Sequence, residues 1–199
     1  MAVLEAGRVT ETSAACLVDA PLAEQEQRAL DARLWEAAKA GDAAAVERLA
    51  GEGASADAKD EDGWPAVVIA AREGHTEVVE ALLRLGCDPN APDGGGVTAL
   101  MVAAIHGHGG VVSALLEHGG AELDAVNKNG ATALMHAANG GHVAIAAQLV
   151  EAGADATLRA TGGAWEGKTA LEIAETTESW DSEETKQGKA EVAALLRQR

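Results

Sequence analysis

The chain has 199 residues, a formal net charge of −17 and a hydrophobic fraction of 47%. This length accommodates a domain with a proper core, and this hydrophobic fraction argues against wholesale disorder. The negative charge argues against nucleic acid and anionic membranes as partners, because both are bound through clustered Lys and Arg. Two cysteines, no leader-like apolar segment and no run of about 18 apolar residues favour the cytoplasm or the nucleus.

The apolar residues are mostly small. The sequence contains no Phe and no Tyr, only four Trp, and abundant Ala, Val and Leu. Small side chains let helices approach closely, whereas sheets prefer β-branched and aromatic residues. The composition therefore predicts many close-packed helices.

Residues 1–20 are expected to form a tail, and residues 21–62 a degenerate first helix pair. The first helix is predicted to begin near Pro21, with leucines recurring on one side up to Leu34. Short strings from Leu34 to Leu49 lie 33 residues before similar strings further along the chain. This pair is therefore expected to cap the N-terminal end of a stack of repeats.

A glycine-led string then recurs four times, with its glycines 33, 34 and 37 residues apart. The four strings occupy residues 63–67, 96–100, 130–134 and 167–171. In the first three units, paired small residues, a Gly-His pair and apolar pairs four residues apart follow, and such apolar pairs lie on one stripe of a helix. Each unit is therefore predicted to contain a turn, a short helix, a Gly-His break, a second helix and an exit turn. The full units span about residues 63–95, 96–129 and 130–162.

The first helix of each unit is expected to begin after a capping residue. Thr98, Thr132 and Thr169 stand where a hydroxyl can accept a hydrogen bond from the helix N-terminus. Pro65 occupies the corresponding place in the first full unit. This proline predicts a weaker cap and a finger that is bent differently.

The C-terminal unit, about residues 163–199, is interrupted twice. An insertion of four residues within 161–166 lengthens the finger before its first helix, which is predicted to start near Ala170. The apolar stripe of its second helix, around Val192, arrives nine residues late. A loop is therefore expected around residues 178–186.

This pattern resembles the ankyrin repeat, whose signature reads Gly-x-Thr-Pro-Leu-His-x-Ala-Ala, then Gly-His, then paired Val and Leu, then Gly-Ala-Asp. The resemblance covers about residues 31–199, where several linked positions return in register. In all four units Ala replaces the Pro of the signature. The resemblance implies an all-α solenoid of helix-turn-helix units with β-turn fingers, and a non-catalytic protein that binds other proteins.

In ankyrin proteins the partner usually lies in a groove formed by the finger tips and the ends of the first helices. Carried over to this sequence, the resemblance places finger tips at Glu61, Asp62, Trp64, Val97, Lys128, Asn129, Ala131 and Lys168. It places helix ends at Arg72, Glu73, Ile105, His106 and Asn139. Trp165 joins these candidates because it stands in the last finger, and exposed Trp is common in binding hot spots. The expected partner is a protein segment with an apolar anchor and with basic flanks facing residues 60–62.

One string suggests a different chemistry. Residues 162–169 match the phosphate-binding loop pattern of glycine, any four residues, then Gly-Lys-Thr. No buried strand precedes the string, and the following helix carries Glu172 and Glu175, which would repel phosphate. Gly167 and Thr169 of this string already occupy repeat positions. A nucleotide-binding enzyme is therefore the least favoured function, and no catalytic residue, cofactor or small-molecule substrate is expected.

The histidines and one cysteine favour structural roles. His75, His108 and His142 occupy the same place in successive units, so they are expected to belong to the inter-helix turn and to hold no metal. Cys87 stands where other units have Ala, which predicts a small core residue.

Charge is segregated along the chain. Residues 34–63 hold eight acids and three bases, and residues 172–184 hold six acids and no base, whereas residues 97–167 hold six acids and two bases. The acidic ends either steer a basic partner or simply keep the protein soluble. Two interpretations of function stay open: a protein-binding adaptor or regulator, and a permanent structural subunit of a larger assembly.

Overall fold

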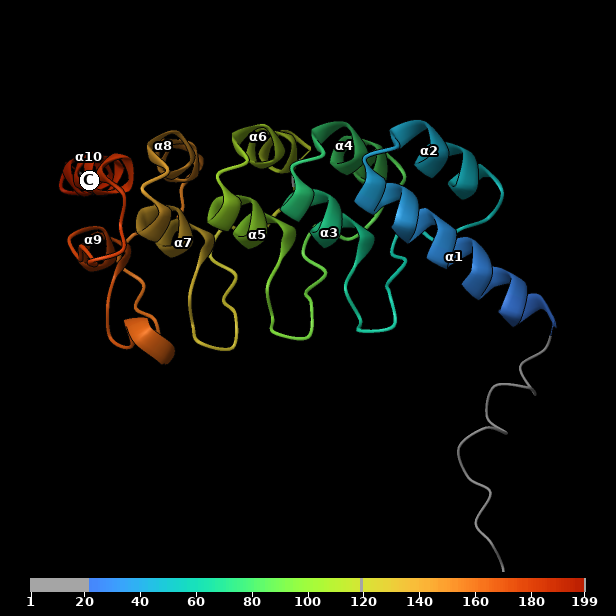
Figure 1. The fold of residues 1–199 in the computed structure, drawn as a ribbon, viewed down its shortest axis with the longest axis horizontal. Helices are drawn as coiled ribbons and strands as arrows, with labels where there is room; N and C mark the ends of the chain where they lie inside the picture. Colours follow the sequence, from blue (N-terminus) through green and yellow to red (C-terminus); the bar gives the residue numbers. More distant parts are fainter. Residues whose placement is uncertain (1–21, 119, 199) are drawn as a thin grey trace, which may run out of the picture.

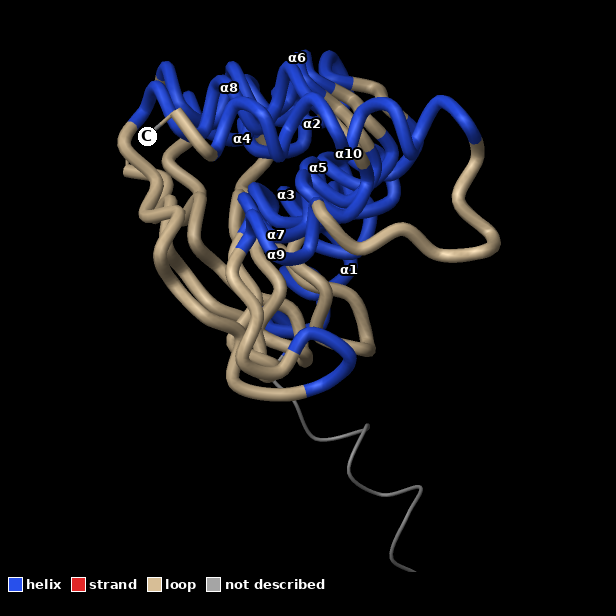
Figure 2. Tube along the Cα trace, turned by 90° about the vertical axis from the view of Figure 1, so that its left-hand side faces the viewer, coloured by secondary structure: helices blue, strands red, loops and turns tan. Residues whose placement is uncertain are grey.

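The computed structural model describes residues 22–118 and 120–198, and the tail expected over residues 1–20 lies outside the described residues. The described residues form two rows of helices that run side by side along the long axis, with finger loops projecting beside one row (Figure 1). The view along the stack shows the same order of outer helices, inner helices and fingers (Figure 2). The all-α solenoid of helix pairs is confirmed.

The inner row, next to the fingers, contains the first helix of each pair. These helices are α1 (Leu22–Ala40), α3 (Ala66–Glu73), α5 (Ala99–His106), α7 (Ala133–Gly140) and α9 (Ala170–Ala174). The outer row contains α2 (Ala43–Gly51), α4 (Thr76–Arg84), α6 (Gly109–Glu117), α8 (Val143–Ala152) and α10 (Glu183–Leu196). Within the described segments, no helix combines the length and the apolar character needed to cross a membrane.

The caps of the inner helices follow the sequence prediction. The hydroxyls of Thr98, Thr132 and Thr169 accept hydrogen bonds from the backbone N–H three residues further on. Pro65 makes no such side-chain bond, so the weaker cap of α3 is confirmed. Its finger carries a β-bridge between Lys59 and Pro65. The expected difference in bend was wrong, because Asp60 N–H donates to the Trp64 carbonyl at 3.1 Å as Asp93 N–H donates to the Val97 carbonyl at 3.0 Å in the next finger.

Histidines link each pair of helices to the preceding pair. The Nε2 atoms of His75, His108 and His142 donate to the carbonyl oxygens of Lys39, Arg72 and Ile105 at 3.1, 2.9 and 3.3 Å. Each ring lies against a glycine of the preceding unit, where an added Cβ would come within 2.8 Å of the imidazole. The structural interpretation of these histidines is therefore confirmed.

A second ladder joins the exit turns of successive units. Backbone N–H groups donate to side-chain oxygens of the preceding unit at 2.8 Å, in the pairs Asp88 to Asp57, Glu122 to Asn90 and Asp155 to Asp124; within the first helix pair, Ser55 donates to Asp31 of α1 at the same distance. Each bond satisfies an N–H group that follows a helix end. Together the two ladders hold the units in a fixed register.

The core runs as one continuous layer between the two rows of helices. Leu82, Leu115 and Leu149 in the outer helices are completely buried, and paired alanines fill the inner helices. Cys87 is also buried, and burial, reinforced by Asp57 and Asp88, raises the pKa of its thiol to about 12. Cys87 is therefore a core residue, as predicted.

The last helix pair departs from the predicted loop boundary. The sequence predicted a loop around residues 178–186, but α10 already begins at Glu183. Its start is set by Ser182, whose hydroxyl accepts a hydrogen bond from the N–H of Thr185 at 3.1 Å. Helix α10 then packs on α7, because Gly188 and Gly141 bring the two backbones together without side chains between them.

Candidate partner-binding groove

The fingers are closed by short side chains that bond to their own backbone. In the first finger, Asp60 Oδ1 accepts the N–H groups of Asp62 and Trp64 at 3.0 and 2.7 Å. Asp93 and Asn127 make the equivalent pair of bonds in the next two fingers. These turns leave the side chains of the tips free to point outward.

The first finger presents a tryptophan backed by a cation. The indole of Trp64 is half-buried, and the guanidinium of Arg72 lies 5.7 Å from its ring centroid. The carbonyl of Trp64 accepts a hydrogen bond from Trp35 Nε1 at 2.8 Å. Glu61 and Asp62 are exposed beside it. The finger thus combines a fixed aromatic surface with negative charge.

The end of α5 lies in the middle of the candidate groove. Ile105 is 39% exposed at the end of α5, and its carbonyl is bonded by His142 of the following unit. The neighbouring His106 is exposed and stacks on His108 with ring centroids 6.0 Å apart. Burial, followed by the charges of His108 and Arg72, lowers the pKa of His106. Near neutral pH this imidazole is therefore mostly uncharged.

The remaining candidates differ in how exposed their side chains are. Glu73, Lys128, Asn129 and Asn139 are exposed, and Val97 is half-buried in the second finger. Ala131 is almost fully buried, so its placement at an exposed tip was wrong. Alanine has no atoms beyond Cβ to reach the surface that the longer side chains reach at the same place in other fingers.

The last finger folds back on the preceding unit. The indole of Trp165, in the 3-10 turn η2 (Gly163–Trp165), meets the ring of His136 edge-on with centroids 5.1 Å apart. Burial lowers the pKa of His136 to about 4. The carbonyl of Asn129 accepts the N–H groups of Thr161 and Gly162 at 2.9 and 3.0 Å. Trp165 is therefore half-buried against its own chain.

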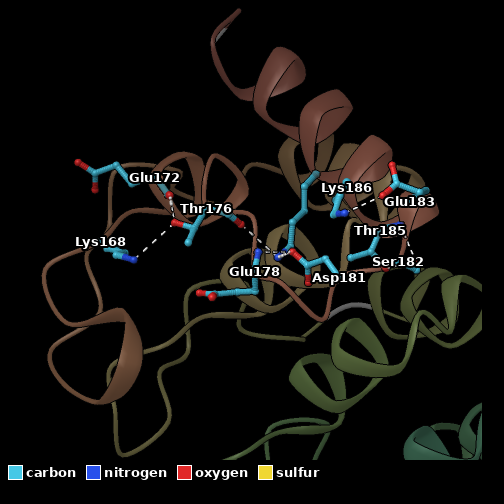
Figure 3. Close-up of polar contacts among 10 residues, drawn as sticks. Lys168, Glu172, Thr176, Glu178, Asp181, Ser182, Glu183, Thr185 and Lys186 are labelled. Atoms are coloured by element: carbon cyan, nitrogen blue, oxygen red, sulfur yellow. Dashed lines mark hydrogen bonds and ion pairs between the residues drawn. The ribbon is translucent and has the colours of Figure 1, made fainter.

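The string that matches a phosphate-binding loop has a different geometry. The N–H of Thr169 donates to Glu172 Oε2 at 2.7 Å, which lowers the pKa of that carboxyl, and Arg159 donates to the same oxygen at 2.8 Å. Lys168 is half-buried, and its Nζ lies 3.4 Å from Thr176 Oγ1 (Figure 3). A carboxylate thus occupies the N-terminus of α9 where a phosphate would have to bind.

Sequence reasoning missed two contacts made by the candidate residues. His136 received no role, because only the inserted Trp165 brings a ring against it. The contact of Arg72 with Trp64 was also missed, although both residues were candidates. In residues 22–118 and 120–198, no three His, Cys, Asp or Glu side chains gather where they could hold a metal ion.

The fold defines a class of protein: a repeat solenoid with finger loops beside a row of inner helices. A family model of ankyrin repeats (3 copies) matches residues 34–127 and 119–182. The chain therefore belongs to the ankyrin-repeat family, whose members generally mediate protein–protein interactions. None of the curated proteins matches the chain.

Proposed function

We propose that this protein is a non-catalytic adaptor or regulator that holds a segment of a partner protein in its groove. The observation that carries the proposal is Ile105, a large apolar side chain that is 39% exposed on a helix end whose backbone is held by His142. Rigidly held apolar residues bind with a small loss of conformational entropy. Surface hot spots are built from such anchors.

The chemistry of the groove indicates the kind of segment. Val97 and Ile105 offer apolar contacts, and Trp64 adds an aromatic surface. Glu61 and Asp62 place carboxylates at the first finger. The partner segment is therefore apolar in its centre and basic on the side that faces the first finger.

The test compares two apolar residues of equal exposure. Ile105 is 39% exposed at the end of an inner helix, and Leu85 is 40% exposed at the end of outer helix α4. The wild type, Ile105→Asp and Leu85→Asp are used as baits in affinity purification, and each captured protein is then purified and titrated against all three. We expect the partner to bind the wild type and Leu85→Asp, and to lose at least about tenfold in affinity for Ile105→Asp.

The opposite result would favour a different function. If Leu85→Asp loses the partner and Ile105→Asp keeps it, the outer helices form the interface. A complex that also fails to dissociate on dilution would identify a permanent structural subunit. The observation that favours this second function is Leu85, an exposed apolar residue at the end of outer helix α4.

A further inference from the structure

An unusual loop joins the two helices of the last unit. The three preceding units pass from the inner to the outer helix through a two-residue break of Gly and His, whereas eight residues, 175–182, separate α9 from α10. We call residues 175–182 the terminal loop. Figure 2 shows a loop beside α9 and α10 standing out at the right of the view, beyond the ends of the helices. The groove described above does not include it.

The terminal loop is held by a buried ion pair. Lys189 on α10 is 1% exposed, and its Nζ donates to Asp181 Oδ2 at 2.7 Å and to the carbonyl of Thr176 at 3.2 Å. The same carboxylate oxygen accepts the N–H of Glu178 at 2.8 Å (Figure 3). Desolvation offsets most of what a buried ion pair contributes to stability. The two bonds of Lys189 nevertheless tie the terminal loop to α10.

The loop displays an isolated indole. Trp180 is 80% exposed, the highest value among the large apolar residues of the described segments. The other three indoles have partners within the chain: Lys39 for Trp35, Arg72 for Trp64 and His136 for Trp165. The ring of Trp180 meets no cation and no other ring in residues 22–118 and 120–198. An ordered loop therefore presents a free aromatic face to solvent.

The surroundings of this indole are acidic. Residues 175–184 contain five acids and no base. Three of the acids are paired with bases of α10 and the residue after it: Asp181 with Lys189, Glu183 with Lys186 and Glu175 with Arg197. Glu178 and Glu184 form no ion pair with any other described residue. The charge that remains near Trp180 is therefore negative.

We propose that Trp180, flanked by Glu178 and Glu184, is a second docking point, which takes an Arg- or Lys-bearing segment of a partner protein. A cation binds favourably over an indole face, as Lys39 and Arg72 do within this chain, and nearby carboxylates strengthen its attraction. The braced loop lowers the entropy lost on binding. This inference rests on the proposed function only in taking a protein segment as the ligand.

The test uses a synthetic peptide of Gly and Ser with three Arg residues, and a matched peptide in which citrulline replaces Arg. Each peptide is titrated at low ionic strength into the full chain labelled with ¹⁵N, and the indole N–H signal of Trp180 is followed. The signal is assigned by its disappearance in Trp180→Phe. We expect the Arg peptide to shift this signal saturably and the citrulline peptide to leave it in place.

Variants locate the binding. Because Trp180 is exposed, Trp180→Ala should fold normally, which circular dichroism checks, and we expect it to bind the Arg peptide about three- to tenfold more weakly. Glu178→Gln with Glu184→Gln should weaken binding, and the weakening should shrink as salt is added. Ser179→Ala, a neighbour in the same loop, should bind as the wild type does.

Three outcomes would overturn the docking point: equal shifts with both peptides, no shift with either, or unchanged affinity in Trp180→Ala. If Ile105→Asp removes the binding and Trp180→Ala does not, the peptide lies in the groove. That result would overturn this inference and leave the proposed function standing. If peptide binding depends on Trp180 and the Ile105→Asp variant still binds its partner protein, the docking point at Trp180 stands and the proposed function is overturned.

Discussion

The imidazole of His108 lies with its Nε2 atom 2.9 Å from the carbonyl oxygen of Arg72 in the preceding unit. The same ring fills the space beside Gly74, where an added Cβ would come within 2.8 Å of it. Gly74 also ends α3 with a φ of 79°, which side chains other than glycine rarely adopt. His108 thus ties the end of inner helix α3 to the start of α6, the outer helix of the following unit.

Removal of this histidine should loosen the interface between the two units. We expect His108→Ala to lower the free energy of unfolding by about 1–3 kcal/mol, because a carbonyl loses its partner and a small cavity opens. Urea unfolding measures the loss. The control is His118→Ala, because His118 is exposed and its Nδ1 contacts a carbonyl of its own helix. An equal loss in both variants would contradict a special role for the ladder.

The contact of Gly188 with Gly141 should tolerate no methyl group. A Cβ at Gly188 would lie 2.2 Å from the carbonyl oxygen of Gly141, so α10 would have to move away from α7. We expect Gly188→Ala to lower the free energy of unfolding by about 1–3 kcal/mol. Gly51 in α2 has nothing within 4 Å of its Cβ position, so Gly51→Ala should raise stability by about 0.4–1 kcal/mol. Thermal unfolding of both variants tests these two expectations. A Gly188→Ala variant as stable as the wild type would contradict the close contact between Gly188 and Gly141.

Stability should fall on mild acidification because of His136. Burial lowers its pKa from 6.5 to about 4, so between these values the unfolded chain binds a proton that the folded chain does not. The contribution is complete above pH 6.5 and is lost progressively toward pH 4, at about 1.4 kcal/mol per pH unit at most. We expect His136→Gln to flatten this slope in urea unfolding at pH 7, 6 and 5. If the free energy of unfolding falls equally with pH in the wild type and in His136→Gln, another titratable group causes the loss of stability.

Trp64 and Leu82 should separate binding from folding. Leu82 is completely buried between units, so Leu82→Ala should lower the free energy of unfolding by about 2–5 kcal/mol. Trp64 is half-buried, and we expect Trp64→Ala to cost less in folding but at least about 2 kcal/mol in partner binding. Melting temperature and partner affinity are measured for both. If Trp64→Ala melts the protein as Leu82→Ala does, the indole is a core residue.

The string that resembles a phosphate-binding loop should bind no nucleotide. Glu172 occupies the N–H of Thr169, and its negative charge opposes a phosphate at the same place. We expect no heat of binding from ATP or GTP with magnesium at millimolar concentration, and Lys168→Ala should fold as the wild type does. Saturable, magnesium-dependent binding that disappears in Lys168→Ala would contradict this expectation.

The caps and buried stripes of the repeats could be predicted because each depends on residues a few positions apart. Thr98 and Thr132 cap helices that begin at the next residue, and Leu82 and Leu115 recur on the same stripe of successive outer helices. Each unit contacts mainly the units next to it, so a residue pattern that recurs at a fixed spacing is enough to predict the fold. The candidate groove followed from the same register.

The insertions could not be predicted in this way. The sequence placed Trp165 in a finger, but its contact with His136 depends on how four extra residues fold back. Lys189 shares a helical stripe with the buried Val192 and Leu196, and its charge is accommodated there because the terminal loop returns to pair it with Asp181. No periodic constraint acts on an inserted segment, so its contacts depend on the surface that it meets.

The sequence alone determined the two rows of helices, their caps and the edge on which a partner is expected, because these depend on local geometry repeated along the chain. The tertiary structure alone decided which members of an equivalent set are exposed. Trp64, Val97 and Ala131 hold the same place in three fingers, but only the two larger side chains extend beyond the buried layer. Exposure depends on side-chain size and on the neighbouring unit, and a repeat pattern specifies neither at a variable position.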